Sequence, residues 1–226
     1  MSVQGKGAVA IWHDIAPEGR DAFYAWHGRE HMPERAGIPG FLRGRRYVSV
    51  DGAPEYFNLY ETTTTAVLTG AAYLDRLNAP TPWTTQTVPH FRNVSRSVCE
   101  VAHSAGHGDG GLVATWRYDV PDASAQAHRR GAAERLDRLL DDPDVAAVHL
   151  LVADAQGSAI ETAEKRARAD VTLIPRWIVL VECWGDANRF EGLVRTFTTD
   201  PLFAQASTTP AWALYRLQNT KDAPRG

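Results

Sequence analysis

The stretch His103-Ser-Ala-Gly-His-Gly-Asp-Gly-Gly111 divides the 226-residue chain nearly in half. It holds four glycines in nine residues and shows no apolar periodicity. This composition is typical of a flexible connection between structural units. We therefore expect a first unit over residues 1–102, a linker over 103–111, a second unit over 112–220 and a tail over 221–226.

The two halves resemble each other in sequence, which indicates an internal duplication. Val9-Ala10-Ile11-Trp12 in the first half matches Val113-Ala114-Thr115-Trp116 in the second half. Two later pairs of segments also match, residues 56–61 with 177–182 and residues 78–83 with 199–203. A repeat is best identified before a fold is assigned, because each copy is then expected to have the same order of elements.

Each half shows the same order of periodicities. Alternating apolar residues predict strands, and apolar residues three and four apart predict helices. In the first half they predict strand 8–14, helix 18–32, strands 41–50 and 55–62, helix 65–78 and strand 92–102. In the second half they predict strand 112–119, helix 123–141, strands 145–153 and 176–184, helix 186–197 and strand 211–218. Each βαββαβ unit makes an antiparallel four-stranded sheet with both helices on one face, so two units can cover their bare faces sheet to sheet.

Strand alternation predicts the side chains that line the interior between the two sheets, because successive side chains of a strand point to opposite faces. If Val9, Ile11, Phe57 and Leu59 face the helices, large aromatic and some polar side chains point inward. These are Ala10, Trp12, Asp14, Tyr56, Asn58, Tyr60, Trp116, Tyr118, Trp177 and Val179. Such an interior describes an apolar pocket with a few orienting polar groups. The alternative is that the aromatic rings simply fill the space between the sheets.

The densest group of titratable residues lies at the end of the first predicted helix. Trp26-His27-Gly28-Arg29-Glu30-His31-Met32-Pro33-Glu34-Arg35 places His27 and His31 four residues apart, and therefore on one helix face, with Glu30 beside them. Pro33 and Pro39 are expected to end the helix, because the residue before a proline disfavours the helical region. The segment is either a reactive cluster or a solvated helix end.

This segment resembles the EthD-like branch of the dimeric α/β-barrel superfamily, in which a tryptophan-rich helix ends in His-x-Pro-Glu and leads into Pro-Gly-Phe and Arg-Tyr. The matching residues are His31-Met32-Pro33-Glu34, Pro39-Gly40-Phe41 and Arg46-Tyr47, with further likeness at Pro82-Trp83-Thr84 and Arg96. The second half matches in element order only and has Ala133-Glu134-Arg135-Leu136 in place of the motif.

The resemblance implies an α+β fold, with two tandem ferredoxin-like βαββαβ units packed sheet to sheet as an α/β barrel. It also implies a cavity between sheet and helices that processes small, often aromatic or polyketide-like molecules, with one working pocket per chain. Members of the superfamily include cofactor-free monooxygenases, cyclases, dehydratases, isomerases and some haem enzymes, and the fold alone does not choose among them.

Proton transfer by histidine is the first candidate chemistry. An imidazole titrates near pH ~6.5, so His27 or His31 can serve as a general base or acid, and Glu30 or Glu34 would orient the ring. Arg46 or Asn58 would stabilise negative charge on a substrate oxygen. The alternative is that one histidine packs beside a tryptophan and the other caps the helix end, where a cation is favoured by ~0.3–1 kcal/mol.

Metal binding is the second candidate. The segment formally matches the H-x-x-E-H pattern of zinc peptidases, but a site needs three or four ligands and only two are visible. His13 and His90 would add a third only if the fold brings them close. We expect no metal and no organic cofactor, and no phosphate loop, nucleophile elbow or nicotinamide fingerprint is present.

Each of the remaining candidate site residues also has a purely structural alternative role. Arg46 would bind a substrate oxyanion or form a surface ion pair, Trp83 would wall the pocket or anchor the last strand, and Asp14 would act as a base or pair with an arginine. His149, Glu61 and Glu182 are expected to have structural partners. The charged segment 161–170 reads as a solvated loop or short helix.

Taken together, these features predict a cofactor-independent enzyme that acts on a small hydrophobic or aromatic carbonyl compound, as a lyase, dehydratase, cyclase or isomerase. The catalytic residues would be His27, His31, Glu30 and Arg46. The substrate-binding residues would be Trp12, Asp14, Tyr56, Asn58, Tyr60, Trp83, Trp116 and Trp177. The alternatives are a monooxygenase or a metal- or haem-dependent enzyme in the same cavity, or a non-catalytic small-molecule-binding protein.

Composition limits the partners. The formal net charge is -3 and no stretch clusters Lys and Arg densely, which argues against nucleic acid. No long apolar window or export signal is visible, so we expect a cytoplasmic protein that does not enter a membrane. Cys99 and Cys183 lie in apolar contexts and are expected to be reduced. The chain would be a monomer that acts as a pseudo-dimer, or a homodimer.

Overall fold

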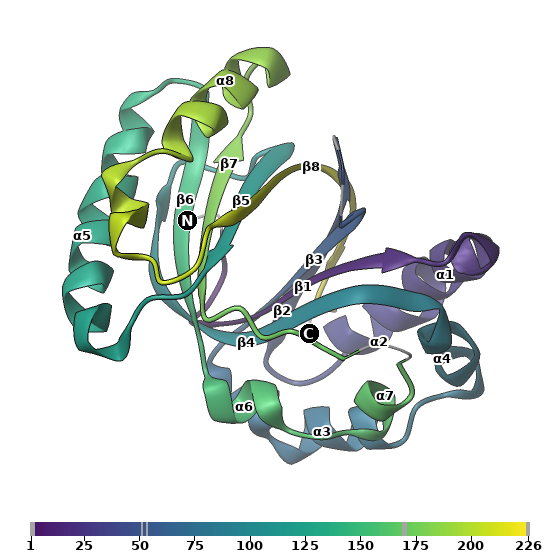
Figure 1. Ribbon diagram of the computed structural model, residues 1–226. Coiled ribbons are helices and arrows are strands. Elements are labelled where there is room, and N and C mark those ends of the chain that lie inside the picture. Colours follow the sequence, from purple (N-terminus) through teal and green to yellow (C-terminus); the bar gives the residue numbers. More distant parts are fainter. Residues whose placement is uncertain (1–2, 51, 53, 169–170, 225–226) are drawn as a thin grey trace.

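A closed antiparallel barrel forms the centre of the protein (Figure 1). The computed structural model describes residues 3–50, 52, 54–168 and 171–224. The strands are β1 (Gly7–Ile15), β2 (Phe41–Ser49), β3 (Tyr56–Thr62), β4 (Phe91–Gly106), β5 (Leu112–Tyr118), β6 (Val145–Ala153), β7 (Trp177–Cys183) and β8 (Ala211–Asp222). Their order around the barrel is β1-β3-β2-β8-β5-β7-β6-β4.

Each half contributes four neighbouring strands in the same order. The first half reads β4-β1-β3-β2, and the second reads β6-β7-β5-β8. Pairing of β2 with β8 and of β4 with β6 joins the edges of the two sheets, so neither sheet keeps an exposed edge. The predicted α+β barrel of two tandem ferredoxin-like units is confirmed.

Helices cover the outside of the barrel, one group over each half (Figure 1). The first half carries η1 (Pro17–Gly19), α1 (Arg20–Trp26), η2 (His27–His31), α2 (Met32–Ala36), η3 (Thr65–Thr69), α3 (Ala71–Asn78), α4 (Pro82–Thr87) and η4 (Val88–His90). The second half carries η5 (Asp122–Ser124), α5 (Ala125–Asp137), η6 (Arg138–Asp141), α6 (Ala155–Ala159), α7 (Ala163–Arg166), α8 (Ala187–Phe197) and η7 (Pro201–Gln205). No helix within the described residues is long and apolar enough to cross a membrane.

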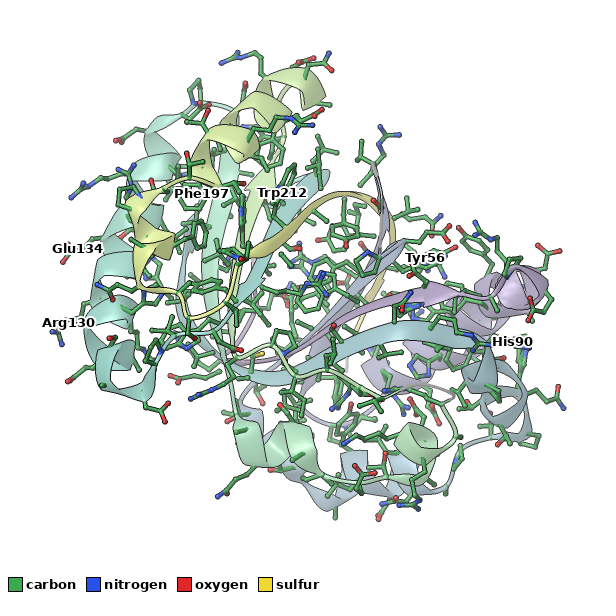
Figure 2. The ribbon with its side chains drawn as sticks, viewed as in Figure 1. Tyr56, His90, Arg130, Glu134, Phe197 and Trp212 are labelled. Atoms are coloured by element: carbon green, nitrogen blue, oxygen red, sulfur yellow. The ribbon has the colours of Figure 1, made fainter. Side chains whose placement is uncertain are left out.

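Helices α5 and α8 cover the second half of the barrel, and each has an exposed face and a buried face. On α5, Arg130 and Glu134 are exposed and point away from the barrel, while Leu136 is buried (Figure 2). On α8, Phe197 packs edge-on against Trp116, with ring centroids 5.1 Å apart. Both helices are therefore amphipathic and bury one face against the sheet.

The barrel interior is a packed core. Trp12 stacks on Phe57 with ring centroids 4.7 Å apart, and Tyr47 stacks on the same ring at 5.5 Å. The indole Nε1 of Trp12 donates a hydrogen bond to Thr115 Oγ1 of the second half, at 3.2 Å. The alternative that aromatic rings fill the space between the sheets therefore describes the centre of the barrel.

In several strands, the prediction of which side chains point into the barrel is wrong, because the alternation is displaced by one residue. Phe57 and Leu59 lie in the barrel interior instead of facing the helices. Side chains that were expected inward, apart from Ala10 and Trp12, face the helices or lie at strand ends, namely Asp14, Tyr56, Asn58, Tyr60, Trp116, Tyr118, Trp177 and Val179. Every residue of β3 and β7 is buried, so apolar character does not distinguish the two faces, and a shift of one residue exchanges them.

The same shift affects the predicted repeat in the first strand of each half. Glu61 is opposite Ala8, and Glu182 is opposite Val113. The match of residues 56–61 with 177–182 therefore makes Ala8 equivalent to Val113, whereas the sequence comparison aligned Val113 with Val9.

A buried ion-pair network joins the two halves of the barrel. Arg45 Nη1 donates to both carboxylate oxygens of Glu182, at 3.0 Å each, and Arg45 also pairs with Glu61. His149 contacts Glu182 at 3.3 Å. Burial alone would raise the pKa of Glu182, but the charge of Arg45 and hydrogen bonds from His149 and Gly110 lower it to about 2. The expected structural partners of Glu61, His149 and Glu182 are thus present.

The predicted linker is held by this network. Strand β4 continues to Gly106, into the segment expected to be flexible. Beyond it, Asp109 accepts a hydrogen bond from Arg43 at 2.7 Å, and the Gly110 N–H donates to Glu182 at 2.8 Å. The glycine-rich composition reflects close backbone approach as well, because a Cβ at Gly110 would lie 2.5 Å from the backbone nitrogen of Cys183.

The segment between β6 and β7, residues 154–176, crosses from the second half onto the first. Its helix α7 lies beside α3 and its helix α6 lies beside β4 (Figure 1), and the Asp154 N–H donates to Val98 O of β4. Leu173 forms a parallel bridge to Ser95. The prediction of a short helix within 161–170 is confirmed by α7, but the prediction that this segment is solvated is wrong for Glu164 and Arg168, whose side chains are 6% and 7% exposed. Residues 169–170 lie outside the described residues.

Candidate functional site

The histidine motif lies in the middle of a continuous helical segment that contains a π-helical turn. Helix α1 leads directly into the π turn η2 and then into α2, so the helix passes through Pro33 and ends at Ala36. The prediction that Pro33 ends the helix is wrong. The Met32 N–H bonds to His27 O five residues back, so the ladder is already altered where the proline lacks its N–H.

The π turn turns both histidine rings toward the sheet of the first half. The rings of His27 and His31 have centroids 5.4 Å apart and are tilted by 31°. Both side chains are buried, at 3% and 7% exposure. The solvated-helix-end alternative is therefore excluded, and π turns of this kind are frequent at functional sites.

His27 lies between Arg46 and Tyr60. Arg46 Nη1 is 3.3 Å from His27 Nδ1, and the Tyr60 hydroxyl is 3.2 Å from His27 Nε2. A guanidinium only donates hydrogen bonds, so Nδ1 accepts and the ring is neutral, with its proton on Nε2. Burial, followed by the charges of His31 and Arg46, holds the pKa of His27 well below its usual value.

His31 packs against Trp26, with ring centroids 4.3 Å apart and ring planes tilted by 36°. Its Nδ1 is buried and has no hydrogen-bond partner among the residues that the structure describes. Burial, with the charges of Arg35 and Arg168, lowers its pKa well below the usual value. At neutral pH His31 is therefore uncharged, with one ring nitrogen free for a ligand.

A third buried imidazole, His13 of β1, joins the cluster. Its Nε2 accepts a hydrogen bond from Asn58 at 2.9 Å, and its Nδ1 donates to the carbonyl of Asp14 at 3.3 Å. Burial lowers its pKa to about 3. The sequence suggested His13 only as a remote metal ligand. The signal for its position was its strand parity, because it alternates with Trp12 and must face the helices.

Arg46 is 5% exposed and its guanidinium packs over aromatic rings, with Cζ 5.0 Å from the Tyr24 ring centroid and 5.6 Å from that of Phe23. Its Nε has no hydrogen-bond partner in the described part of the chain. Burial lowers its pKa. Arg46 is thus part of the histidine cluster, and the alternative of a surface ion pair is excluded.

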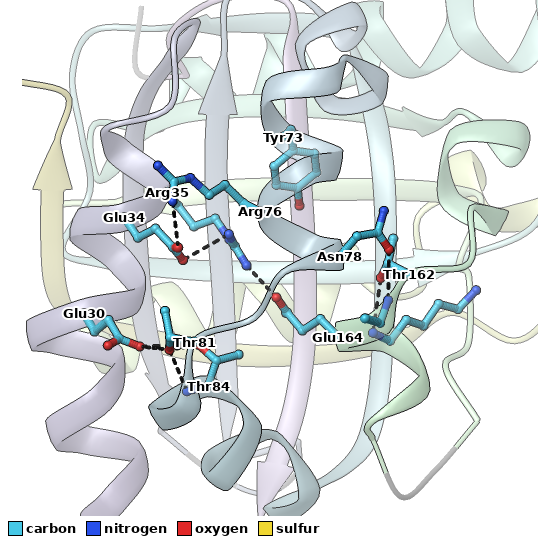
Figure 3. Close-up of polar contacts among 12 residues, drawn as sticks. Glu30, Glu34, Arg35, Tyr73, Arg76, Asn78, Thr81, Thr84, Thr162 and Glu164 are labelled. Atoms are coloured by element: carbon cyan, nitrogen blue, oxygen red, sulfur yellow. Dashed lines mark hydrogen bonds and ion pairs between the residues drawn. The ribbon is translucent and has the colours of Figure 1, made fainter.

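The two acidic residues of the motif do not contact the histidines. Glu30 accepts hydrogen bonds from Thr81 and Thr84, at 2.6 and 3.4 Å, and Glu34 pairs with Arg35 (Figure 3). The expectation that Glu30 or Glu34 orients an imidazole is therefore wrong. Thr84 also accepts a hydrogen bond from the Trp26 indole at 3.0 Å, so Glu30 fixes the helix rather than the imidazoles.

Several other predicted binding residues lie away from the cluster. Asp14 accepts hydrogen bonds from the Glu55 N–H and from Asn93, at the end of the strand. Trp12 is in the barrel interior, and Trp116 and Trp177 pack under the helices of the second half. Trp83 packs against the aromatic core beside the histidines. The structure thus gathers Tyr56, Asn58 and Tyr60 at the site, but on the helix side of the sheet.

A charged layer borders the cluster and was missed by the sequence analysis. Arg35 Nη2 donates to Glu164 of the segment between β6 and β7, at 2.5 Å (Figure 3), and Arg168 donates to the same carboxylate at 3.3 Å. These residues come from a part of the chain more than 100 positions away, so no local pattern could place them at the motif.

The described residues contain no group of three or more His, Cys, Asp or Glu side chains that could hold a metal ion. A cavity of about 360 Å³ opens beside Arg117, and a groove of about 390 Å³ lies between α5 and η7. Neither is lined by His27 or His31. Cys99 and Cys183 are buried and free.

Comparison with solved structures shows the fold. An anthrone oxidase-like protein superposes with a TM-score of 0.69 at 13% identity, over 100% of this chain and 97% of that chain. A Fusobacterium nucleatum protein provisionally assigned as a monooxygenase gives 0.59 at 9% identity, over 97% and 95% of the two chains. A Lactobacillus acidophilus protein with the same provisional assignment gives 0.56 at 8% identity, over 96% and 97%. No family model and no curated protein matches the sequence.

The fold and the site define a class. This chain is similar to ferredoxin-like α/β-barrel proteins, and it carries a buried cluster of imidazoles between the sheet and the helices of its first half.

Proposed function

We propose that this protein is an enzyme that moves protons on a small aromatic or hydrophobic carbonyl compound, at His27 and His31 and without an organic cofactor. The observation that carries the proposal is the pair of buried neutral imidazoles beside Arg46. A base must be uncharged before it accepts a proton, and a lowered pKa keeps an imidazole in that state at neutral pH. The likeness of the motif to the EthD-like branch supports the same conclusion.

His31 is the better candidate for the group that accepts the proton. Its Nδ1 is buried and finds no partner within the described ranges, whereas His27 is held between Arg46 and Tyr60. Proton transfer to His31 would create an imidazolium next to a substrate anion, and the two opposite charges would stabilise each other. His27 would relay or hold a second proton, other than the one that His31 accepts.

Arg46 supplies the charge that such a reaction needs. Removing a proton next to a carbonyl places negative charge on its oxygen, and donors that are aimed in advance at this oxygen lower the barrier. Arg46 Nε has no partner within the described residues. Burial among Phe23, Tyr24 and neighbouring rings strengthens its field, because the local dielectric is low.

Buried polar atoms without partners support a ligand site here. His31 Nδ1, Arg46 Nε and Asn58 Oδ1 all belong to the cluster. Each unsatisfied buried group costs about 1–3 kcal/mol. Structures that retain such groups tend to do so where a ligand or a reaction requires them.

Oxygenation is the second candidate reaction at the same site. The names of the neighbours, an anthrone oxidase-like protein and two provisional monooxygenases, favour it. The chain's own residues would perform the same first step, removal of a proton by an imidazole. His27 is not available to a haem iron, because both of its ring nitrogens already have partners in Arg46 and Tyr60.

Proton exchange tests the proposal directly. Anthrone is a suitable probe, and exchange of its methylene protons in D₂O can be followed by NMR. We expect wild type to accelerate exchange, and His31→Ala and His27→Ala each to lose about 10²–10⁴-fold of the acceleration. His107→Ala, in the exposed loop after β4, is the control and should retain full activity.

Folding of each variant is checked by its thermal midpoint, so that a loss of exchange is not a loss of structure. A folded His27→Ala, His31→Ala double variant that exchanges anthrone as fast as wild type would refute the proposal. Wild type that fails to accelerate exchange in anthrone and in a panel of phenolic ketones would refute it as well.

A further inference from the structure

The cavity beside Arg117 is a second concave site, distinct from the histidine cluster. Its volume of about 360 Å³ lies within the range of roughly 300–1,000 Å³ that is typical of small-molecule sites. No histidine of the described residues lines it. One wall is apolar and consists of Leu173, Ile174, Pro175 and Ala211.

The two halves of the chain build this cavity together. Ser95 of β4 comes from the first half, Arg117 of β5 and Ala211 of β8 come from the second half, and Leu173 comes from the segment between β6 and β7. The Leu173 N–H donates to Val94 O at 2.9 Å, and Leu173 O accepts from the Arg96 N–H at 2.8 Å. These backbone hydrogen bonds hold the apolar wall against β4.

The guanidinium of Arg117 is held in place at the cavity. Its Cζ lies 4.9 Å from the centroid of the Trp12 ring, and its Nη1 donates to Ser95 Oγ at 3.1 Å. Trp12 belongs to the packed interior of the barrel, so its ring supports one face of the guanidinium. Arg117 is therefore ordered before any ligand binds.

The charge of Arg117 is not paired with a carboxylate of the described residues. Its Nε is buried without an acceptor there, and its Nη2 lacks one too but remains accessible at the cavity. Asp119 also lines the cavity, but its Oδ1 accepts the Arg176 N–H at 3.2 Å, and it forms no ion pair with Arg117 in the described part of the chain. A partly buried guanidinium without an acceptor is costly, and an anion in the cavity would supply one.

We infer that this cavity binds a small organic acid, with its carboxylate on Arg117 and its hydrocarbon body on the apolar wall. A guanidinium matches a carboxylate in geometry and charge. Leu173 is 64% exposed although it is aliphatic, so a hydrocarbon body that covers it removes apolar surface from water. A free inorganic anion would gain nothing from this wall.

Calorimetric titration of the full chain tests the site without any measurement of activity. Benzoate is the probe, benzamide is its neutral analogue of similar shape, and inorganic phosphate is the competing anion. We expect benzoate to bind wild type at least 10-fold more tightly than benzamide or phosphate. Arg117→Met should weaken benzoate binding by at least 10-fold, and Arg117→Lys should weaken it less.

Arg216→Met is the matched control, because Arg216 is an exposed strand arginine on the neighbouring strand β8 and does not line the cavity. It should bind benzoate like wild type. Equal affinity for benzoate and benzamide, unchanged affinity in a folded Arg117→Met variant, or displacement of benzoate by an equal concentration of phosphate would each overturn the inference.

Leu173→Asp keeps the test decisive if Arg117→Met does not fold. Its side chain is largely exposed, so the variant should fold, and a negative charge on the apolar wall should weaken benzoate binding by at least 10-fold. Unchanged affinity in this variant would refute the placement of the hydrocarbon body.

Arg46→Met separates this cavity from the histidine cluster, which also contains an arginine. Benzoate in the cavity should bind to Arg46→Met as it does to wild type. Loss of binding in Arg46→Met but not in Arg117→Met would place the acid in the histidine cluster and overturn the inference. The result does not depend on the proposed function, because proton exchange in anthrone is not part of the measurement.

Discussion

Replacement of His13 by glutamine should change how the stability of the protein depends on pH. The imidazole is fully buried and hydrogen-bonded to Asn58 and to the carbonyl of Asp14. Burial, with smaller contributions from the charges of Arg168 and Arg46, lowers its pKa to about 3, although the hydrogen bond to Asp14 acts in the opposite direction. The folded protein therefore keeps this ring neutral in acid, whereas the unfolded chain does not.

The size of the effect follows from the two pKa values. Above pH ~6.5 the ring is neutral in both states and its ionisation does not affect stability. Below that pH the unfolded chain binds a proton that the folded protein excludes, so stability falls until the pH reaches the folded value of about 3. At pH 4.5, two units below the unfolded value, the loss is about 3 kcal/mol.

Urea unfolding at pH 7.5 and at pH 4.5, followed by tryptophan fluorescence, measures this loss. At pH 7.5 we expect His13→Gln to be less stable than wild type by about 1–3 kcal/mol, because the variant loses ring packing against Tyr56 and Phe91. At pH 4.5 the difference should shift in favour of the variant by about 3 kcal/mol. His27 and His31 are present in both proteins, so their contribution cancels.

Phe23→Leu is the control, because Phe23 packs against His13 with ring centroids 5.3 Å apart but carries no titratable group. Its loss of stability should be the same at both pH values. A His13→Gln difference that changes by less than about 0.5 kcal/mol between the two pH values would refute the account of a buried neutral imidazole.

Three further outcomes follow from the structure. Glu182→Gln removes one of the two buried carboxylates that pair with Arg45 and should cost about 3–5 kcal/mol in urea unfolding at pH 7, whereas the exposed Glu100→Gln should cost less than about 1 kcal/mol. Trp12→Ala should cost about 3–5 kcal/mol by the same measurement, because it leaves a cavity at the centre of the barrel. Arg46→Met should keep the thermal midpoint within a few degrees but lower the rate constant of anthrone exchange by about 10²-fold or more, and an unchanged rate would remove Arg46 from the site.

The order of elements could be predicted from the sequence because each strand and helix has a local signature. The strands predicted at 145–153 and 176–184 correspond to β6 and β7, and both carry continuous apolar runs. These continuous apolar runs also explain why the side of the sheet on which each side chain lies could not be predicted. A strand that is buried on both sides has no polar residues to mark one face, and Tyr56, Asn58 and Tyr60 were therefore assigned to the wrong side of their sheet.

The candidate site was recognised from its motif but not from its surroundings. His27, His31 and Arg46 carry local signals, and the family resemblance implied a cavity between sheet and helices, where the structure gathers these three side chains in a buried cluster. The helix through Pro33 could not be predicted, because a π turn depends on tertiary contacts rather than on local preference. Arg168 comes from a segment that looks solvated by composition and is buried only by its contact with the other half.

The protonation state of the two motif histidines is the most direct test of the central claim. Two-dimensional ¹H–¹⁵N NMR of the imidazole nitrogens at pH 5.5 distinguishes a neutral ring from an imidazolium, and single substitutions assign His27 and His31. We predict that both rings are neutral at this pH, with the proton of His27 on Nε2. Imidazolium signals from His27 and His31 at pH 5.5 would contradict the account.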